Sequence, residues 1–230
     1  YFTQLRTQRR GRNARKSRWC GHATICGLAP ARKKLAAMQN EINAANRVVI
    51  KVGTSLLIRD GALDKQWLTG LAEEIKTASA RGQQIMVVTS GAVALGSAGA
   101  GLDRQTMTLE QSQAAAAIGQ IALTQGWQDC LADKGLKAAQ ILLTLGDTEQ
   151  RRRYLNARRT LQALLDMGTV PVINENDTVA TQELRYGDND RLAARVAGMM
   201  SADCLILLSD VDGFYTAAPE RMKMPTLSAR

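Results

Sequence analysis

Residues 47–55 read Arg-Val-Val-Ile-Lys-Val-Gly-Thr-Ser, a short β-branched run that ends in a glycine turn. Apolar residues follow at helical spacing from Leu63 to Ala78. Asp64 is suited to cap such a helix, and Gly82 is suited to end it. A buried strand that leads through a glycine turn into an amphipathic helix is the first unit of an α/β fold.

The same alternation of short apolar runs and longer amphipathic stretches continues along the chain. We expect strands at 48–52, 85–89, 139–143, 170–173 and 204–208, helices at 109–132, 147–167 and 190–200, and a Gly/Ala-rich helix that starts after residue 91. Strands that are apolar on both faces and separated by helix-length connections require a parallel sheet with helices on both sides. The predicted fold class is therefore α/β, a doubly wound, mainly parallel sheet.

The first 46 residues differ from the rest in charge. They hold ten of the 30 Lys and Arg residues and one acid, Glu41, so the net charge of +9 belongs to this segment. They show no helical or strand period. We predict a basic, disordered extension at 1–46 that adds nothing to the fold, and a folded domain at 47–230. Two alternatives stay open: a stretch translated ahead of a start near Met38, and an Arg-rich transit peptide.

Composition excludes several classes of protein. A hydrophobic content of 45% and a charged content of 22% exclude wholesale disorder. The single histidine, His22, lies in the basic extension, so the folded part lacks material for a Ser–His hydrolase or for a zinc site with two imidazoles. Cys20, His22 and Cys26 lack a fourth ligand, and we predict no metal-ligating residues.

The cysteines and the uncharged runs bear on where the protein is located in the cell and on whether it spans a membrane. Four cysteines, irregularly spaced in 230 residues, do not form a disulfide framework, and this favours a cytoplasmic location with reduced thiols. The uncharged runs at 82–102 and 111–128 are interrupted by Gly, Gln, Ser and Thr, so neither reads as a membrane span.

Small and polar residues follow the predicted strands. The strand ends carry, in order, Gly53-Thr54-Ser55, Ser90-Gly91-Ala92, Asn174-Glu175-Asn176-Asp177 and Ser209-Asp210. In sheets of this class ligands bind beyond the carboxyl ends of the strands. Tight glycine turns there let backbone N–H groups approach an anion. Taken singly, each turn is also an ordinary connection between a strand and a helix.

Charged residues strengthen the case for a ligand at these strand ends. Lys51 lies inside an apolar strand, which is costly unless a charged partner is present; the alternative is a lysine whose ammonium extends into water. Asp188, Asn189 and Asp190 stand where a helix begins, although capping a helix needs only one such residue.

The common phosphate-binding motifs are absent. The sequence has no G-x-x-x-x-G-K-[ST] run, no H-R-D or D-F-G set, and no G-x-G-x-x-G match among Gly96, Gly99 and Gly101. Phosphoryl transfer nevertheless needs mainly positioning and compensation of charge. A lysine, backbone amides, a carboxylate and Mg²⁺ suffice, and this suits a domain without histidine.

Four segments together resemble a known family. Residues 48–55, 88–92, 170–177 and 187–190 are similar, in the same order, to segments of the glutamate 5-kinases, a branch of the amino acid kinase superfamily. The resemblance covers about 47–218. The first two segments are shared, with variations, by carbamate, aspartate, acetylglutamate and uridylate kinases. The Asn-Glu-Asn-Asp and Gly-Asp-Asn-Asp segments are much more specific to glutamate 5-kinases.

The resemblance implies an activity and its partners. It implies ATP-dependent phosphorylation of the γ-carboxylate of L-glutamate to glutamyl 5-phosphate, the first step toward proline, with Mg²⁺. It also implies an assembly of identical chains and proline as a feedback inhibitor. We expect neither a membrane partner nor a specific nucleic acid.

The resemblance also implies a role for each matching residue. Lys51 would stabilise the transferring phosphoryl group, and Asp190 would organise the active-site lysines. The nucleotide would contact Lys51, Gly53, Thr54, Ser209 and Asp210, and glutamate would contact Ser90, Gly91, Asp177 and Asn189. A carboxylate at Asp177 suits an α-ammonium, while Ser90 and Asn189 could donate hydrogen bonds to a carboxylate.

One departure from the family concerns the end of the chain. The family continues to a Gly-rich loop with a second lysine, and often to an RNA-binding-like domain, whereas this sequence ends at Arg230. We therefore expect a fragment. Two alternative functions stay open: a kinase for another small acid such as acetylglutamate, against which Asp177 argues, and a non-catalytic module that binds an amino acid.

Overall fold

Six parallel strands form the central sheet of the computed structural model, which describes residues 2–3, 39–180 and 188–209. The strands are β1 (Phe2–Thr3), β2 (Arg47–Val52), β5 (Gln84–Val88), β6 (Lys137–Leu143), β7 (Thr169–Glu175) and β8 (Cys204–Leu208). Their order across the sheet is β1-β8-β2-β5-β7-β6, and every pair of neighbours is parallel. The predicted α/β class with a parallel sheet is confirmed.

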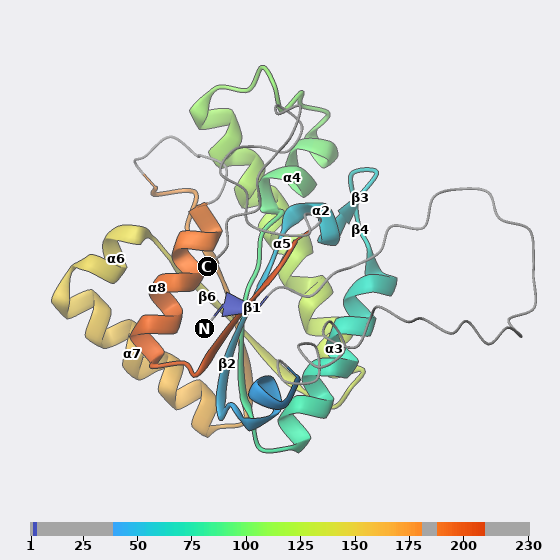
Figure 1. Cartoon of the computed structure of the whole chain (residues 1–230). Helices are drawn as coiled ribbons and strands as arrows, with labels where there is room; N and C mark the ends of the chain where they lie inside the picture. The colour runs from blue at the N-terminus through green and yellow to red at the C-terminus, as the bar shows by residue number, and fades with distance from the viewer. Residues whose placement is uncertain (1, 4–38, 181–187, 210–230) are drawn as a thin grey trace, which may run out of the picture.

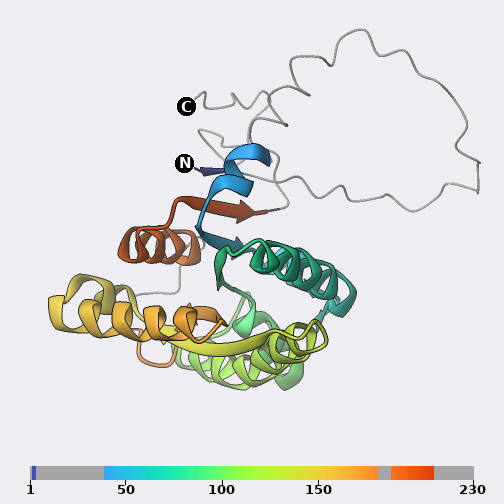
Figure 2. The ribbon, with the colours of Figure 1, turned by 90° about the horizontal axis from the view of Figure 1, so that it is seen from below.

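Helices cover both faces of this sheet. They are α2 (Thr54–Leu57), α3 (Lys65–Ala80), α4 (Ala92–Ala100), α5 (Leu109–Ala132), α6 (Leu145–Glu149), α7 (Arg151–Asp166) and α8 (Asp188–Met200). Figures 1 and 2 show α3 and α5 on one face of the sheet and α7 and α8 on the other. This is the doubly wound arrangement that the alternating sequence predicts.

Alternate side chains of β2 enter two separate hydrophobic cores. Val48, Ile50 and Val52 pack with residues of α3 and α5, whereas Val49 packs with residues of α7 and α8. Successive side chains of a strand point to opposite faces, so Lys51 belongs to the same face as Val49, the face that α8 covers. The period of the strand therefore decides which helix the lysine can reach.

The hairpin after β2 was not predicted. β3 (Ile58–Arg59) and β4 (Ala62–Leu63) pair antiparallel around Asp60 and Gly61, whose φ angles are 52° and 77°. Two consecutive residues with positive φ form the tight turn that Asp-Gly favours, so this dipeptide was the available signal. Arg59 then pairs with Asp64 at 2.8 Å, and Asp64 caps α3 as expected.

The helix expected at 147–167 is wrong as a single element. Gln150 has an extended backbone (φ −77°, ψ 115°) and separates α6 from α7. Thr144 and Asp147 form a reciprocal capping box that starts α6 at Leu145. The Thr-x-x-Asp spacing indicates this earlier start, but nothing local marks Gln150 as a break.

The end of the basic extension contributes to the domain. Residues 39–44 are helical, Ala45 is buried, and the Gln83 side chain donates to the carbonyl oxygens of Ile42 at 2.7 Å and Ala45 at 2.6 Å. The expectation of a disordered segment without contacts is therefore wrong for 39–46. It is also wrong for Phe2–Thr3, which form β1 and pair with β8. Residues 4–38 lie outside the described residues, and the domain boundary at 47 stays a prediction.

The amino ends of the central strands, which we call the amino edge, are held by two charged side chains. Arg47 donates to Gln84 Oε1 at 2.7 and 3.0 Å, to Gln162 Oε1 at 3.0 Å and to the carbonyl oxygen of Met200. The Asp203 carboxylate accepts hydrogen bonds from the backbone N–H groups of Asn46, just before β2, at 2.8 Å and of Arg47, its first residue, at 2.9 Å. The polar groups of this edge thus find partners within the protein.

Within the described residues, no helix is long and apolar enough to cross a membrane. Cys130 and Cys204 are buried, and Cys130 takes part in no disulfide in the part of the chain that the structure describes.

Candidate active site

The carboxyl ends of the central strands, which we call the carboxyl edge, carry an ion pair. Lys51 stands near the end of β2, and Asp190 lies in the first turn of α8. Lys51 Nζ lies 2.7 Å from Asp190 Oδ1, with the lysine side chain 12% exposed and the aspartate side chain 50% exposed. The lysine therefore does not extend freely into water. Asp190 supplies the charged partner that a lysine in an apolar strand requires.

Gly53 keeps the space beside this ammonium open. A Cβ atom at Gly53 would lie 3.8 Å from Lys51 Nζ and 3.4 Å from the carbonyl oxygen of Leu208, which are ordinary contacts. Its φ of −74° suits any residue, so the backbone does not require glycine. A close approach of another molecule to the turn gives a reason for glycine there.

The residues that the resemblance assigns to the nucleotide follow two neighbouring strands, β2 and β8. Val52 pairs with Leu208 in the register of β2 and β8, and the N–H of Gly53 donates to Leu208 O at 3.2 Å. Ser209 follows Leu208 directly, so the turn at Gly53 and Ser209 are adjacent at the carboxyl edge. Thr54 begins α2. Asp210 lies outside the described residues.

Asn189 joins the end of β5 to the start of α8. Its Nδ2 donates to the carbonyl oxygen of Thr89 at 2.8 Å, to Ser90 Oγ at 2.8 Å and to Asn174 Oδ1 at 3.1 Å. Gly91 follows with a φ of 108°, and a Cβ there would lie 3.1 Å from Ile58 Cγ1, so this position requires glycine. The structure thus brings Ser90, Gly91 and Asn189 together, next to the Lys51–Asp190 pair.

One hydrogen-bonding atom of this cluster is unsatisfied. Asn189 Oδ1 is buried and has no hydrogen-bond partner among the described residues. An unmet buried acceptor costs about 1–3 kcal/mol. The expectation that Asn189 donates to a substrate carboxylate meets a difficulty, because its amide hydrogens already have protein acceptors. Ser90, which accepts from Asn189, keeps its own hydroxyl proton for donation.

A cavity of about 440 Å³ lies between α5 and the carboxyl ends of β6 and β7, and Ser90, Gly91 and Asn189 are not among the residues that line it. Asp177, just beyond β7, lines it together with Gln120 of α5 and Gln140 of β6. Asp177 is thus placed at a hollow large enough for a small acid. Hydrogen-bonded side chains connect this cavity to the cluster. Gln120 accepts a hydrogen bond from the Asn174 side chain at 2.8 Å, and Asn174 accepts one from the Asn189 side chain.

A second carboxylate at the carboxyl edge is fully engaged by the protein. Asp147 Oδ2 accepts from the backbone N–H of Thr144 at 2.8 Å and from its hydroxyl at 2.7 Å, and Asp147 Oδ1 pairs with Arg153 at 3.0 Å. Burial raises the pKa of Asp147, but the hydrogen bonds from Thr144 and the charge of Arg153 outweigh burial and hold that pKa below its usual value.

Comparison with known proteins identifies the family. The sequence model of the amino acid kinase family matches residues 46–229. The chain belongs to the amino acid kinase family. It is 60% identical over 176 residues to glutamate 5-kinase 1 of Mesorhizobium japonicum, covering 76% of this chain and 47% of that relative. It is 55% identical over 186 residues to glutamate 5-kinase of Sinorhizobium fredii, covering 80% and 47%.

A third relative gives the same picture. Glutamate 5-kinase of Brucella ovis is 55% identical over 185 residues, covering 80% of this chain and 49% of the relative. The chain therefore spans about half the length of the curated relatives that it matches. The matched region of this amino acid kinase contains every residue proposed from the resemblance.

Sequence reasoning missed part of the site. In the sequence, Gln120 is one of several glutamines on a long helix, and Thr89 is only the last residue of a predicted strand. Trp127 donates to Thr89 Oγ1 at 3.0 Å and thereby holds the strand end in the core of this amino acid kinase. No sequence signal separates Gln120 from Gln113 or Gln128, since their roles depend on what faces each helix position.

Proposed function

We propose that this amino acid kinase uses ATP to phosphorylate the γ-carboxylate of L-glutamate, forming glutamyl 5-phosphate, the first step toward proline. The observation that carries the proposal is the 2.7 Å pair between Lys51 Nζ and Asp190 at the carboxyl end of the central strand. Sequence identity of 55–60% to relatives named glutamate 5-kinase supports the choice of substrate.

The reaction explains why no histidine is needed. A carboxylate oxygen of the substrate forms the new bond to phosphorus while the bond to the ADP oxygen breaks, and no proton has to move. The protein must position the two reactants and compensate charge on the transferred group. Lys51 supplies a compact positive charge for this purpose, and Asp190 holds its ammonium at the carboxyl edge.

The nucleotide would lie over the turn after β2. Gly53 leaves the space beside Lys51 free for phosphate oxygens. Thr54 and Ser209 lie at the same edge of the sheet, and Asp210 follows Ser209 in the sequence. Mg²⁺ is part of the proposal, since this ion usually binds through one or two carboxylates together with substrate phosphates. The described residues contain no group of three or more His, Cys, Asp or Glu side chains that could hold a metal, so the ion would come with the phosphates and neutralise their charge when bound.

The substrate would lie between the Asn189 cluster and the cavity. Asp177 would pair with the α-ammonium, and Ser90, Gly91 and Asn189 would contact the rest of the amino acid. We also propose an assembly of identical chains, inhibition by proline and a cytoplasmic location. The buried Cys130, which takes part in no disulfide within the described residues, supports the last of these.

Two measurements test the function. Calorimetric titrations with L-glutamate and with Mg·ATP should each show binding. The chain should form ADP only when glutamate is present. With hydroxylamine added, a hydroxamate should also form, because hydroxylamine traps the acyl phosphate product. Both are measured on this chain and on a chain extended to the length of the relatives.

Three outcomes would contradict the proposal. Turnover with N-acetylglutamate but not with glutamate would indicate a kinase for another small acid. Glutamate binding without Mg·ATP binding in either chain would indicate a non-catalytic amino-acid-binding module. Absence of glutamate binding in both chains would exclude this substrate.

A further inference from the structure

A chain of amide side chains runs from α5 to the Asn189 cluster. Gln120 Nε2 donates to Thr124 Oγ1 at 3.1 Å, and Gln120 Oε1 accepts from Asn174 Nδ2 at 2.8 Å. Asn174 Oδ1 accepts from Asn189 Nδ2 at 3.1 Å, and the same Nδ2 donates to the carbonyl oxygen of Thr89 at 2.8 Å. We call these side chains, from Thr124 to Asn189, the amide relay.

The carbonyl of Thr89 sets the direction of the whole relay. A backbone carbonyl can only accept, so Asn189 must turn its NH₂ group toward Thr89. Asn174 must then offer its oxygen to Asn189 and its NH₂ group to Gln120. Turning over any one of the three amides alone would set oxygen against oxygen or NH₂ against NH₂, so they keep their orientation as a unit.

Burial makes the relay dependent on Gln120. Asn174 is only 2% exposed, so water cannot easily replace Gln120 as the acceptor of its NH₂ group. Gln120 itself lines the cavity that contains Asp177. One glutamine of α5 therefore touches both the proposed substrate hollow and the chain of contacts that ends at Asn189.

We propose that Gln120 is a positioning residue, which acts through Asn174 to hold Asn189 in the orientation that substrate binding requires. This inference rests on the proposed function, because that function assigns Asn189 to the substrate. In this orientation the NH₂ group of Asn189 is used within the protein, and its buried Oδ1 is the atom left for a donor. Gln120 need not contact the reacting atoms.

The first test does not depend on any ligand. In side-chain amide NMR spectra of the ¹⁵N-labelled chain, the Asn189 signal is assigned by its loss in Asn189→Ala. Gln120→Met keeps the length of the side chain and removes its acceptor, and it should shift the Asn174 and Asn189 NH₂ signals. Gln128→Met, at an exposed position of the same helix, is the matched control and should shift neither.

A second variant covers the case in which Gln120→Met does not fold. Thr124→Val removes the hydroxyl at the far end of the relay with little change of shape, and it should shift the Asn174 and Asn189 signals in the same direction by a smaller amount. An Asn189 signal that stays unchanged in whichever of the two variants folds would overturn the inference.

The second test measures consequences for the substrate. Gln120→Met should weaken glutamate binding roughly tenfold, as expected for one misplaced hydrogen bond to a charged ligand, while Gln128→Met leaves it unchanged. In an Asn189→Ala background Gln120→Met should cause no further loss, whereas additive losses would overturn a role through Asn189. If the wild-type chain fails to bind glutamate, the proposed function fails, and the NMR shifts still decide whether Gln120 orients Asn189.

Discussion

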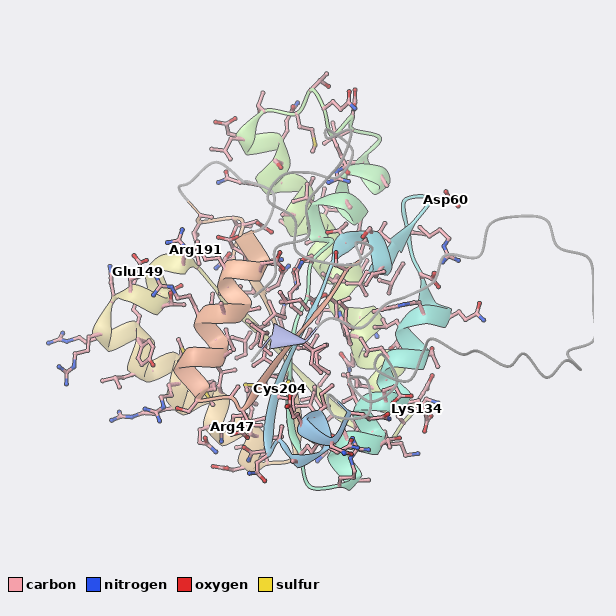
Figure 3. All side chains as sticks on the ribbon, in the orientation of Figure 1. Arg47, Asp60, Lys134, Glu149, Arg191 and Cys204 are labelled. Carbon is pink, nitrogen blue, oxygen red and sulfur yellow. The ribbon has the colours of Figure 1, made fainter. Side chains whose placement is uncertain are left out.

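Polar side chains at the amino edge of the sheet have their hydrogen-bond partners within the protein, whereas some at the carboxyl edge do not. At the amino edge, Arg47 has three acceptor groups within the protein and Asp203 accepts from two backbone N–H groups. At the carboxyl edge, Asn189 Oδ1 has no partner among the described residues, and Asp190 is half exposed beside Lys51. In Figure 3, Arg47 lies toward the lower end of the molecule, where the amino edge is.

This difference indicates which polar groups contribute to the stability of the fold and which are available to bind a ligand. Polar groups that are satisfied within the protein stabilise the fold and leave little for a ligand. Polar groups that are held in place but unsatisfied cost stability, and they regain it when a ligand arrives. We therefore expect substitutions of the satisfied groups, at the amino edge and at Asp147, to change unfolding, and substitutions of the other carboxyl-edge groups to change binding or turnover.

The largest effect is expected at Lys51. Lys51→Ala should lower turnover by about 10²- to 10³-fold, as loss of one group that stabilises transition-state charge does, with much less change in glutamate binding. Lys51→Arg should rescue only part of the loss, because the planar guanidinium does not occupy the same compact site. Steady-state kinetics measures this. An unchanged kcat in the alanine variant would remove Lys51 from the mechanism.

Asp177 should show the next largest effect, on substrate choice. If its carboxylate pairs with the α-ammonium, Asp177→Ala and Asp177→Asn should weaken glutamate binding by roughly 10- to 200-fold, since about 1.4 kcal/mol corresponds to a factor of ten. Glutarate, which lacks the amine, is the control ligand and should lose far less. Equal losses for both ligands would show that Asp177 supports the architecture and does not recognise the ammonium.

Arg47 tests the opposite edge. Arg47→Met removes hydrogen bonds from a charged donor and should lower the free energy of unfolding by about 2 kcal/mol, which corresponds to a fall in Tm of roughly 4–8 °C for a chain of this size. Glutamate affinity should not change. Calorimetric unfolding and titration measure the two quantities. A Tm within a degree of wild type would refute the stabilising role of the amino edge.

A substitution at Gly53 should show whether glycine is needed there for space beside Lys51 or for backbone conformation. Gly53→Ala meets only ordinary contacts, so Tm should stay nearly constant, while Mg·ATP affinity should fall about fivefold because the methyl group stands beside Lys51 Nζ. Gly70→Ala in α3 is the control, since a Cβ there has nothing within 4 Å, and it should leave nucleotide binding unchanged. Undiminished Mg·ATP binding in Gly53→Ala would place the phosphates elsewhere.

The smallest effect concerns pH and Asp147. Its pKa is lowered in the folded protein, so its stabilising contribution is present above the unfolded value of about 3.9 and is lost as the pH falls through the folded value. Asp147→Asn should therefore be less stable than wild type by up to about 1 kcal/mol at neutral pH, with the gap closing in acid. A gap that widened as the pH fell would contradict this assignment.

Much of the fold could be predicted because its signals are local. The helix at 109–132 has the predicted bounds, and the strand predicted at 204–208 matches β8. The break at Gln150 could not be predicted, because the sequence on both sides of it favours helix. The hairpin around Asp60 could have been predicted from its Asp-Gly turn, and it was overlooked because the strands are only two residues long.

The sequence by itself determined the parallel sheet and predicted a ligand site at its carboxyl edge with Lys51 in it, since all three follow from periods and residue types along short stretches. The resemblance implies that Asp190 organises the active-site lysines, and the tertiary structure places its carboxylate 2.7 Å from Lys51 Nζ. Only the tertiary structure shows that Gln120 is hydrogen-bonded to Asn174 and Asn174 to Asn189. The physical reason is that a hydrogen bond depends on distance and direction in space. Gln120, Asn174 and Asn189 are far apart in the chain and meet only because α5, β7 and α8 pack around the same strand ends.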